Sequence, residues 1–318
     1  MKIIVFINTH SKSINGGIIF IKKTTPLKLA SIASVSLLVT ACGSDDSAES
    51  TDMNIGEQME YTITGIEPGA GLTGLTHDAI AEYDSLNGWE LQDSSTAGMM
   101  TELEQAYENE EPIIITGWTP HQMFEMYDLK FLEDPELAFG EPEDIHSLAR
   151  MGLEEDKPEA YAILDNYEWT IDDMQQVVLE AQESSYEEAG LKWVENNQDI
   201  VSEWTEGVDQ VDGEAFELLS TPWDTERGSA HMMKAVLEQQ GYDVTLTNVD
   251  PAILFKAMAT GDGDGTVAPW LPVTHGAFMD EYGEDIDDLG PNISGTVSGL
   301  VVPEYMDIDS IEDIPANE

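Results

Sequence analysis

Residues 113–120, IIITGWTP, indicate a buried strand that ends where a helix begins. Isoleucine and threonine favour a strand, and Pro120 stops it because proline cannot donate to the hydrogen-bonded ladder. Trp118 stands at the exit of this strand, and ligands of α/β sheets bind beyond the carboxyl ends of strands. A tryptophan at a strand end is more often core than site. The rest of the chain must therefore decide between these two interpretations.

Strand and helix patterns alternate on both sides of this stretch. The predicted strands cover 60–67, 112–118, 215–221, 242–249, 266–270 and 298–303, and the predicted helices cover 96–110, 143–153, 158–164, 172–183, 185–198, 227–241 and 251–265. Strands separated by helices predict parallel α/β layers rather than a sandwich or a helical bundle.

Two further tryptophans repeat the pattern of Trp118. Trp223 and Trp270 also lie between a predicted strand and a predicted helix, each beside a proline. Core packing would instead spread tryptophans over helix faces, as expected for Trp193 and Trp204. Three indoles gathered at one sheet edge would form a cage. Such a cage suits a quaternary ammonium or sulfonium cation, which cannot donate ordinary N–H bonds and is held by cation–π attraction.

The N-terminal region has the features of an export signal. Lysines precede an apolar run from Leu29 to Thr40, which is followed by Ala41 and Cys42. VTAC (39–42) resembles a bacterial lipobox, so we expect a signal peptide over 1–41 and lipidation of Cys42. Ordinary cleavage near Ala41, with Cys42 an incidental thiol, is the alternative. Cys42 is the only cysteine, so no disulfide forms within one molecule. The small, acidic residues 42–59 predict a flexible tether.

Charge excludes one class of function. Five of the 12 basic residues lie before Cys42, which leaves seven against 64 acidic residues and a formal charge near −57 after cleavage. Nucleic acid and anionic lipid surfaces would repel this protein. The carboxylates are scattered rather than clustered, which favours a solvated surface adapted to high salt and no metal site. GDGDGT (261–266) lacks the later ligands of a calcium loop and is expected to end a helix.

Five segments carry a family resemblance. IIITGWTPHQMFEMYDLKFLEDP, EDIHSLARMGLEEDKPEAY, WTEGV, GYDVTLTNV and WLPVTH resemble the glycine betaine binding lipoproteins of bacterial osmoprotectant ABC importers, the OpuAC-like substrate-binding proteins. The resemblance covers residues from about 63 to about 315. It implies a two-lobed α/β protein of the type II periplasmic-binding-protein fold, with a ligand cleft between lobes. We place one lobe at 61–147 plus 292–318 and the other at 148–291.

The resemblance also implies a binding site. Trp118, Trp223 and Trp270 match the three tryptophans that surround a trimethylammonium group in the family. The carboxylate would be held by two backbone amides of the turn PGAGLTG (68–74), those of Gly71 and Leu72, and by His275. A zwitterion needs π faces at one end and N–H donors at the other, and glycine lets a backbone approach closely.

Nearby polar residues stay open to two interpretations. His121 either lies near the cleft or has a structural role at a helix N-terminus. Asp224 and Glu226 either add negative potential around a cation or cap the following helix. The core interpretation is kept for Trp89 and Trp169, as well as for Trp193 and Trp204.

We therefore predict a lipid-anchored, extracytoplasmic, monomeric binding protein that captures glycine betaine or a related zwitterion. It would deliver this ligand to an ABC permease and its ATPase, without catalysis, cofactor or metal. Two rival hypotheses are a choline or dimethylsulfoniopropionate-type binding protein of the same fold and a secreted hydrolase of methylated amines. The hydrolase needs a nucleophile, base or metal, and the sequence offers no such constellation.

Overall fold

The computed structural model describes residues 53–317, so the predicted signal peptide, Cys42 and most of the predicted tether lie outside the described residues. The described chain begins with a short helix, α1 (Ile55–Gln58), inside the stretch predicted as tether. Asn54 and Glu57 form a capping box at its start, and Gly56 is buried against the ring of Tyr61. These contacts make the last residues of the predicted tether part of the folded body.

The first lobe is built around three parallel strands. β1 (Thr62–Thr64) pairs with both β2 (Glu90–Gln92) and β3 (Ile115–Thr119). Its other elements are α2 (Gly71–Glu82), α3 (Thr96–Asn109), α4 (Met123–Met126) and β4 (Leu129–Phe131). Helix α3 turns Met99, Leu103 and Ala106 into the core, as its 3.6-residue spacing predicts.

The second lobe repeats this construction. Parallel pairing joins β6 (Ala215–Ser220) to β7 (Asp243–Asn248) and to β8 (Gly265–Thr266). The remaining elements are α5 (Leu153–Asp156), α6 (Pro158–Asn166), α7 (Ile171–Glu183), α8 (Tyr186–Asn196), α9 (Gln198–Trp204), α10 (Asp224–Gln239), α11 (Pro251–Thr260), β9 (Trp270–Leu271) and α12 (Gly276–Tyr282). Gly261 ends α11 in the left-handed region, as expected for GDGDGT.

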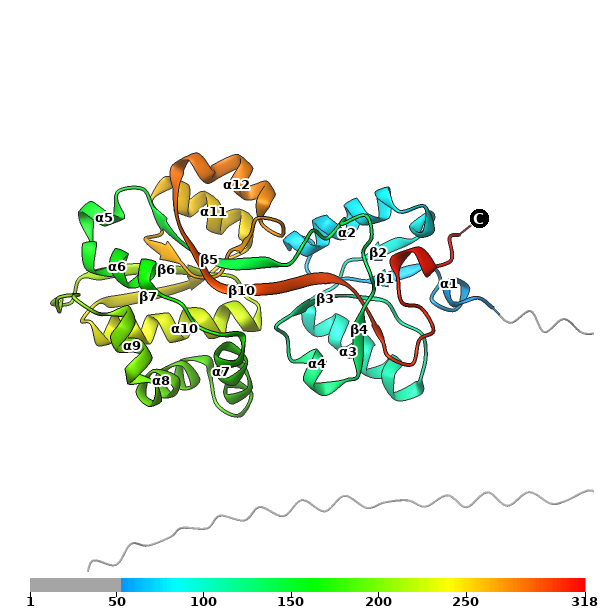
Figure 1. The fold of residues 1–318 in the computed structure, drawn as a ribbon, viewed down its shortest axis with the longest axis horizontal. Coiled ribbons are helices and arrows are strands. Elements are labelled where there is room, and N and C mark those ends of the chain that lie inside the picture. The colour runs from blue at the N-terminus through cyan, green and yellow to red at the C-terminus, as the bar shows by residue number, and fades with distance from the viewer. Residues whose placement is uncertain (1–52, 318) are drawn as a thin grey trace, which may run out of the picture. The chain divides into compact units, whose positions relative to one another are not determined.

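Two long antiparallel strands connect the lobes (Figure 1). β10 (Ile286–Pro303) pairs with β5 (Glu143–Arg150) along its first part and with β3 along Val297–Val301. The sheet is therefore mixed, and not purely parallel, with the order β2-β1-β3-β10-β5-β8-β6-β7. The lobe boundaries expected from the sequence, 147/148 and 291/292, fall inside these two strands, where His146 pairs with Pro291.

The sequence prediction of a helix over 143–153 is wrong, because these residues mostly form β5. Strand neighbours on both sides supply hydrogen bonds: β10 on one edge, and β8 and β9 on the other. Glu143, Ile145 and Ser147 are buried at alternate positions. Tertiary pairing overrides the local preference here, because β-propensity reflects packing more than backbone preference.

The other four tryptophans lie in the core. Trp89 packs edge-on against Tyr61 and donates to the carbonyl of Pro315. Trp169, Trp193 and Trp204 form one aromatic cluster in the second lobe. The structure thus has the predicted α/β class and the predicted two-lobed architecture, and one continuous hydrophobic cluster includes residues of both lobes.

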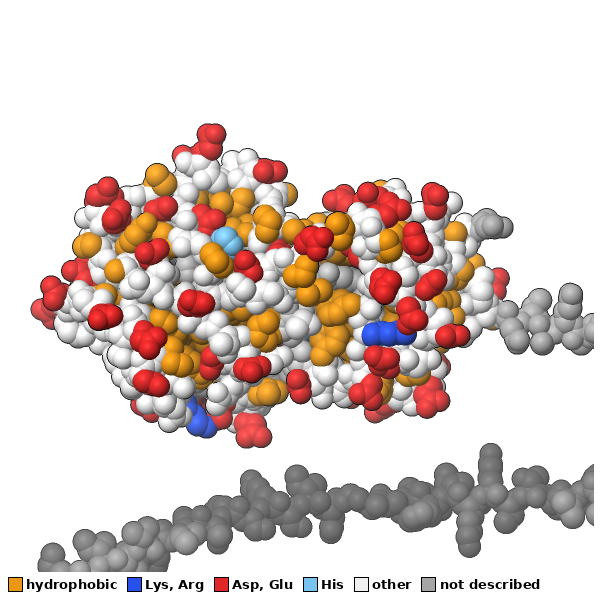
Figure 2. All heavy atoms as spheres, in the orientation of Figure 1, with side chains coloured by type: hydrophobic (Ala, Val, Ile, Leu, Met, Phe, Trp, Pro, Cys, Tyr) orange, Lys and Arg blue, Asp and Glu red, His pale blue; other side chains and the backbone are white. Residues whose placement is uncertain are grey.

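Carboxylates dominate the surface drawn in Figure 2, where acidic side chains are spread over both lobes and lysine and arginine are few. This distribution matches the scatter seen in the sequence. Within residues 53–317, no helix is both long enough and apolar enough to cross a membrane.

Candidate functional site

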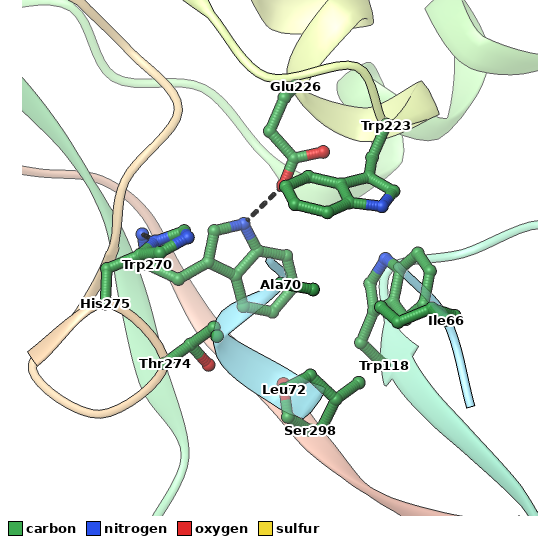
Figure 3. Close-up of a pocket in the computed structure, with 11 residues that line it drawn as sticks. Ile66, Ala70, Leu72, Trp118, Trp223, Glu226, Trp270, Thr274, His275 and Ser298 are labelled. Atoms are coloured by element: carbon green, nitrogen blue, oxygen red, sulfur yellow. Dashed lines mark hydrogen bonds between the residues drawn. The ribbon is translucent and has the colours of Figure 1, made fainter. Parts of the chain in front are cut away.

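A pocket lies where residues of both lobes meet. All six residues predicted for the site line it. The complete lining is Ile66, Ala70, Gly71, Leu72, Trp118, Trp223, Glu226, Trp270, Thr274, His275 and Ser298. Figure 3 shows the indoles of Trp118, Trp223 and Trp270 around one space, with Leu72 and Thr274 on another side of it.

Strand β3 positions Trp118. The residue pairs with Ser298 of β10, so the strand that connects the lobes also fixes this side of the pocket. His121 packs edge-on against the indole, with 4.5 Å between ring centroids. Trp118 is buried, yet one face of its ring borders the pocket.

The other two indoles are held by carboxylates. Trp223 is the N-cap residue of α10, and its Nε1–H donates to Glu67 of the first lobe at 3.0 Å. Trp270 lies in β9 rather than after a strand, and pairs with Ile145 of β5. Its Nε1–H donates to Glu226 at 2.8 Å. Both rings are therefore fixed in rotation about their side-chain bonds.

His275 lines the pocket, and one of its ring nitrogens has no partner among the described residues. Its Nδ1 accepts the backbone N–H of Trp270 at 2.8 Å, so a neutral ring carries its proton on Nε2. Burial lowers the pKa of His275 to about 4, which keeps the ring neutral near pH 7. Nε2 is buried and has no partner among the described residues. The Nε2–H group of His275 is therefore an unsatisfied hydrogen-bond donor.

Gly71 and Leu72 are the first two residues of α2, not part of an irregular turn as the sequence suggested. The N–H groups at the start of a helix have no intrahelical acceptor, and the helix dipole favours an anion there. Space is tight at this end. A Cβ on Gly71 would lie 2.0 Å from the carbonyl oxygen of Thr274, a residue of the opposite lobe.

The turn that carries His275 is anchored by Glu143 of β5. One Glu143 oxygen accepts the N–H groups of Val273 and Thr274, each at 3.0 Å, and the other accepts the Thr274 hydroxyl. Glu143 is almost completely buried. Sequence reasoning missed this residue because it assigned residue 143 to a helix.

Glu226 also escaped a definite assignment. It lies in the first turn of α10 and lines the pocket, so it does not act as the helix cap. Burial raises the pKa of Glu226 to about 7, although hydrogen bonds from Thr225 and Trp270 act in the opposite direction. The spacing of Trp223 and Glu226 within one helical turn is the signal that could have placed both side chains at one site.

The structure separates His121 and Asp224 from the pocket lining. His121 Nδ1 accepts the N–H of Met123 at 3.1 Å, which is the structural role at a helix start. Asp224 accepts a hydrogen bond from Gln122 of the other lobe at 3.3 Å. Over residues 53–317, no group of three or more His, Cys, Asp and Glu side chains is arranged to hold a metal ion.

Comparison with known proteins gives a family match. The model described as the substrate binding domain of ABC-type glycine betaine transport systems, OpuAC, matches residues 43–196 and 217–318. A curated relative from Listeria monocytogenes, the glycine betaine/carnitine transport binding protein GbuC, is 43% identical over 297 residues. That match covers 92% of this chain and 99% of the relative.

Two solved structures are also similar. Lactococcal OpuAC, in its closed-liganded conformation with glycine betaine, is 38% identical, with a TM-score of 0.43 over 47% of this chain. The glycine/betaine/L-proline-binding protein ProX from Borrelia burgdorferi is 31% identical, with a TM-score of 0.45 over 48% of this chain. Each match spans 59% of the solved chain.

Proposed function

The chain belongs to the OpuAC family of substrate-binding domains of ABC-type glycine betaine transport systems, and we propose that it binds glycine betaine or a closely related zwitterion in the pocket between its lobes. The family is one of transport proteins, and a substrate-binding protein of an importer works outside the cytoplasm.

The cationic end of the ligand would lie among the three indoles. A quaternary ammonium group is weakly hydrated and offers no N–H donors, so aromatic faces are its best partners. Trp118 comes from one lobe, and Trp223 and Trp270 come from the other. A ligand between them would contact both lobes and favour the closed state through its differential affinity.

The anionic end would lie against Gly71, Leu72 and His275. The two backbone amides at the start of α2 and the Nε2–H of His275 are all donors, and the site offers them without a competing basic side chain in the lining. A carboxylate satisfies such donors by charge-assisted hydrogen bonds. Choline has a hydroxyl in place of the carboxylate and would use this end poorly.

The single observation that carries the proposal is the shared pocket. Six residues named from widely separated segments line one small cavity, with π faces and N–H donors together. We further propose that lipidated Cys42 anchors a monomer to the membrane, where the closed form docks on an ABC permease served by an ATPase.

Intrinsic tryptophan fluorescence of the purified chain tests this proposal. It is titrated at high salt with glycine betaine, carnitine and choline. We expect a saturable change with glycine betaine and a much weaker response to choline. Trp118→Leu, which removes one cage face, is expected to lower the affinity for glycine betaine at least about tenfold.

Phe124→Leu serves as the matched control. Phe124 also belongs to the first lobe and stacks on Phe131, but it does not line the pocket. It should keep the affinity of the unchanged chain. An equal response to choline and glycine betaine would show that the carboxylate end is misassigned. No response to any of the three ligands would refute the proposal as a whole.

A further inference from the structure

Glu226 is a carboxylate built into the wall of the pocket. Its side chain comes from the first turn of α10, and the residue is only 5% exposed. One oxygen accepts the indole N–H of Trp270 at 2.8 Å, and the other accepts the hydroxyl of Thr225 at 2.6 Å. Figure 3 shows the carboxylate between the rings of Trp223 and Trp270.

This carboxylate lacks a basic partner. Among residues 53–317, no lysine, arginine or histidine forms an ion pair with Glu226. The two hydrogen bonds that it accepts come from neutral groups. A buried charge without a counterion is costly, and it is retained where something compensates for the cost.

Glu67 provides a useful contrast. It also accepts an indole N–H, from Trp223, but it is only partly buried and also binds the N–H and hydroxyl of Thr96. Burial alone would raise the pKa of Glu67, yet these hydrogen bonds hold it below the usual value. Solvent screens a charge in this position. The charge of Glu226 is screened much less, because the residue is almost completely buried.

A carboxylate behind an indole acts on a cation in two ways. Hydrogen bonding to the ring N–H makes the π face more negative, which strengthens its attraction for a cation. The carboxylate also attracts the cation directly, and in a partly desolvated site this attraction is stronger than in water. Neither effect acts on an uncharged group of the same shape.

We propose that Glu226 is the specificity-determining residue that makes the pocket select a cationic head group over a neutral one of equal size. It does so through Trp270 and through its own charge, and the ligand cation is the counterion that the buried carboxylate otherwise lacks. This inference rests on the proposed function, because it assigns the source of cation selectivity within the same pocket.

The test compares glycine betaine with 3,3-dimethylbutanoate, in which a neutral quaternary carbon replaces the quaternary nitrogen. Affinities for both are measured by calorimetry at pH 8 with the purified full-length chain. Glu226→Gln keeps an oxygen to accept the Trp270 N–H but removes the charge. We expect it to weaken glycine betaine binding about tenfold or more and to leave binding of 3,3-dimethylbutanoate, whose head group is uncharged, within about twofold.

Two further variants complete the test. Glu217→Gln is the matched control, because Glu217 belongs to the same lobe and accepts a threonine hydroxyl but does not line the pocket. It should leave both affinities unchanged. Thr225→Val keeps the carboxylate but removes one donor to it, and is expected to lower the preference for glycine betaine by a smaller factor. If the Glu226→Gln variant does not fold, Thr225→Val provides the test in its place.

The outcomes separate this inference from the proposed function. If the unchanged chain does not bind glycine betaine, the proposed function fails. If it binds glycine betaine, and Glu226→Gln or Thr225→Val weakens both ligands equally, Glu226 is only a structural support for Trp270. The inference is overturned if the ratio of the affinities for glycine betaine and 3,3-dimethylbutanoate is the same in these variants as in the unchanged chain.

Discussion

At the scale of single residues, three residues of the site each lack something: a hydrogen-bond partner, a counterion or a side chain. His275 has a buried Nε2 without a partner, and Glu226 is a buried carboxylate without a counterion. Gly71 lacks a side chain at a place where Thr274 of the opposite lobe comes close. A zwitterion of the right length would supply a carboxylate for His275 and a cation for Glu226 at once. The absence of a side chain at Gly71 leaves the space that the lobes need to close around this ligand.

Gly71→Ala is expected to weaken glycine betaine binding by at least about tenfold. The added methyl would overlap the carbonyl of Thr274, a contact far shorter than atoms tolerate, so the lobes could not close fully. Calorimetric titration measures the change. Gly74→Ala, three residues later in α2, has nothing within 4 Å of its added methyl. It should keep the affinity and raise the free energy of unfolding by about 1 kcal/mol.

His275 is expected to make the fold sensitive to acid. Its folded pKa of about 4 lies below the usual 6.5, so between these values the unfolded chain takes up a proton that the folded chain does not. Stability from this group is complete above about pH 6.5 and is lost as the pH falls towards 4. The loss is on the order of 3 kcal/mol. Denaturant unfolding at several pH values measures it.

His275→Gln should flatten that pH dependence. His121 supplies an internal comparison, because burial lowers its pKa to about 4 as well, against an opposing effect of Asp224. His121→Gln should therefore reduce the slope to a similar extent while affecting binding less. An unchanged slope in both variants would contradict the lowered pKa values.

At the scale of elements, β5 shows how one strand serves both fold and site. It pairs with β10, β8 and β9, and its first residue, Glu143, holds the turn that carries His275. The same strand backs Trp270 through Ile145. Glu143 therefore joins strand β5, which connects the lobes, to the turn at the anionic end of the pocket.

Glu143→Ala is expected to lower the free energy of unfolding by about 2 kcal/mol, because it leaves partly buried donors on Val273 and Thr274 without their acceptor. Hydrogen exchange at these two amides should become faster, and glycine betaine binding weaker. Glu141→Ala, two residues earlier and exposed, is the control and should change neither. Unaltered exchange in Glu143→Ala would mean that the turn is held by other contacts.

At the scale of the whole molecule, a few contacts join the two lobes across the cleft. Trp223 donates to Glu67, and Gln122 donates to Asp224. Around them the surface is strongly acidic, with 64 acidic and 12 basic residues in the chain. Self-repulsion of such a surface opposes the compact state when screening is weak.

We expect the melting temperature to rise by several degrees between 0.1 M and 2 M potassium chloride. Salt shortens the distance over which the carboxylates repel one another. Calorimetric scans at several salt concentrations measure the rise. A melting temperature that is independent of salt would argue against adaptation to high salt.

The sequence by itself determined the alternation of strands and helices, the three exceptional tryptophans and the acidic surface. These features follow from local periodicity and composition, which need no tertiary information. The core positions of Met99, Leu103 and Ala106 were predictable for the same reason. The resemblance to a family of binding proteins added Gly71, Leu72 and His275, which residue patterns alone did not connect with the three tryptophans.

Only the tertiary structure decided that residues 143–150 form a strand and which carboxylates hold the residues of the pocket. Residues 143–150 have weak strand propensity, and their pairing on both edges is a property of distant segments. The roles of Glu143 and Glu226 depend on partners 130 and 44 residues away, on Val273 and Trp270. Burial of a charge is set by the whole fold, so no local pattern could predict that the Glu226 carboxylate would be buried without a basic partner.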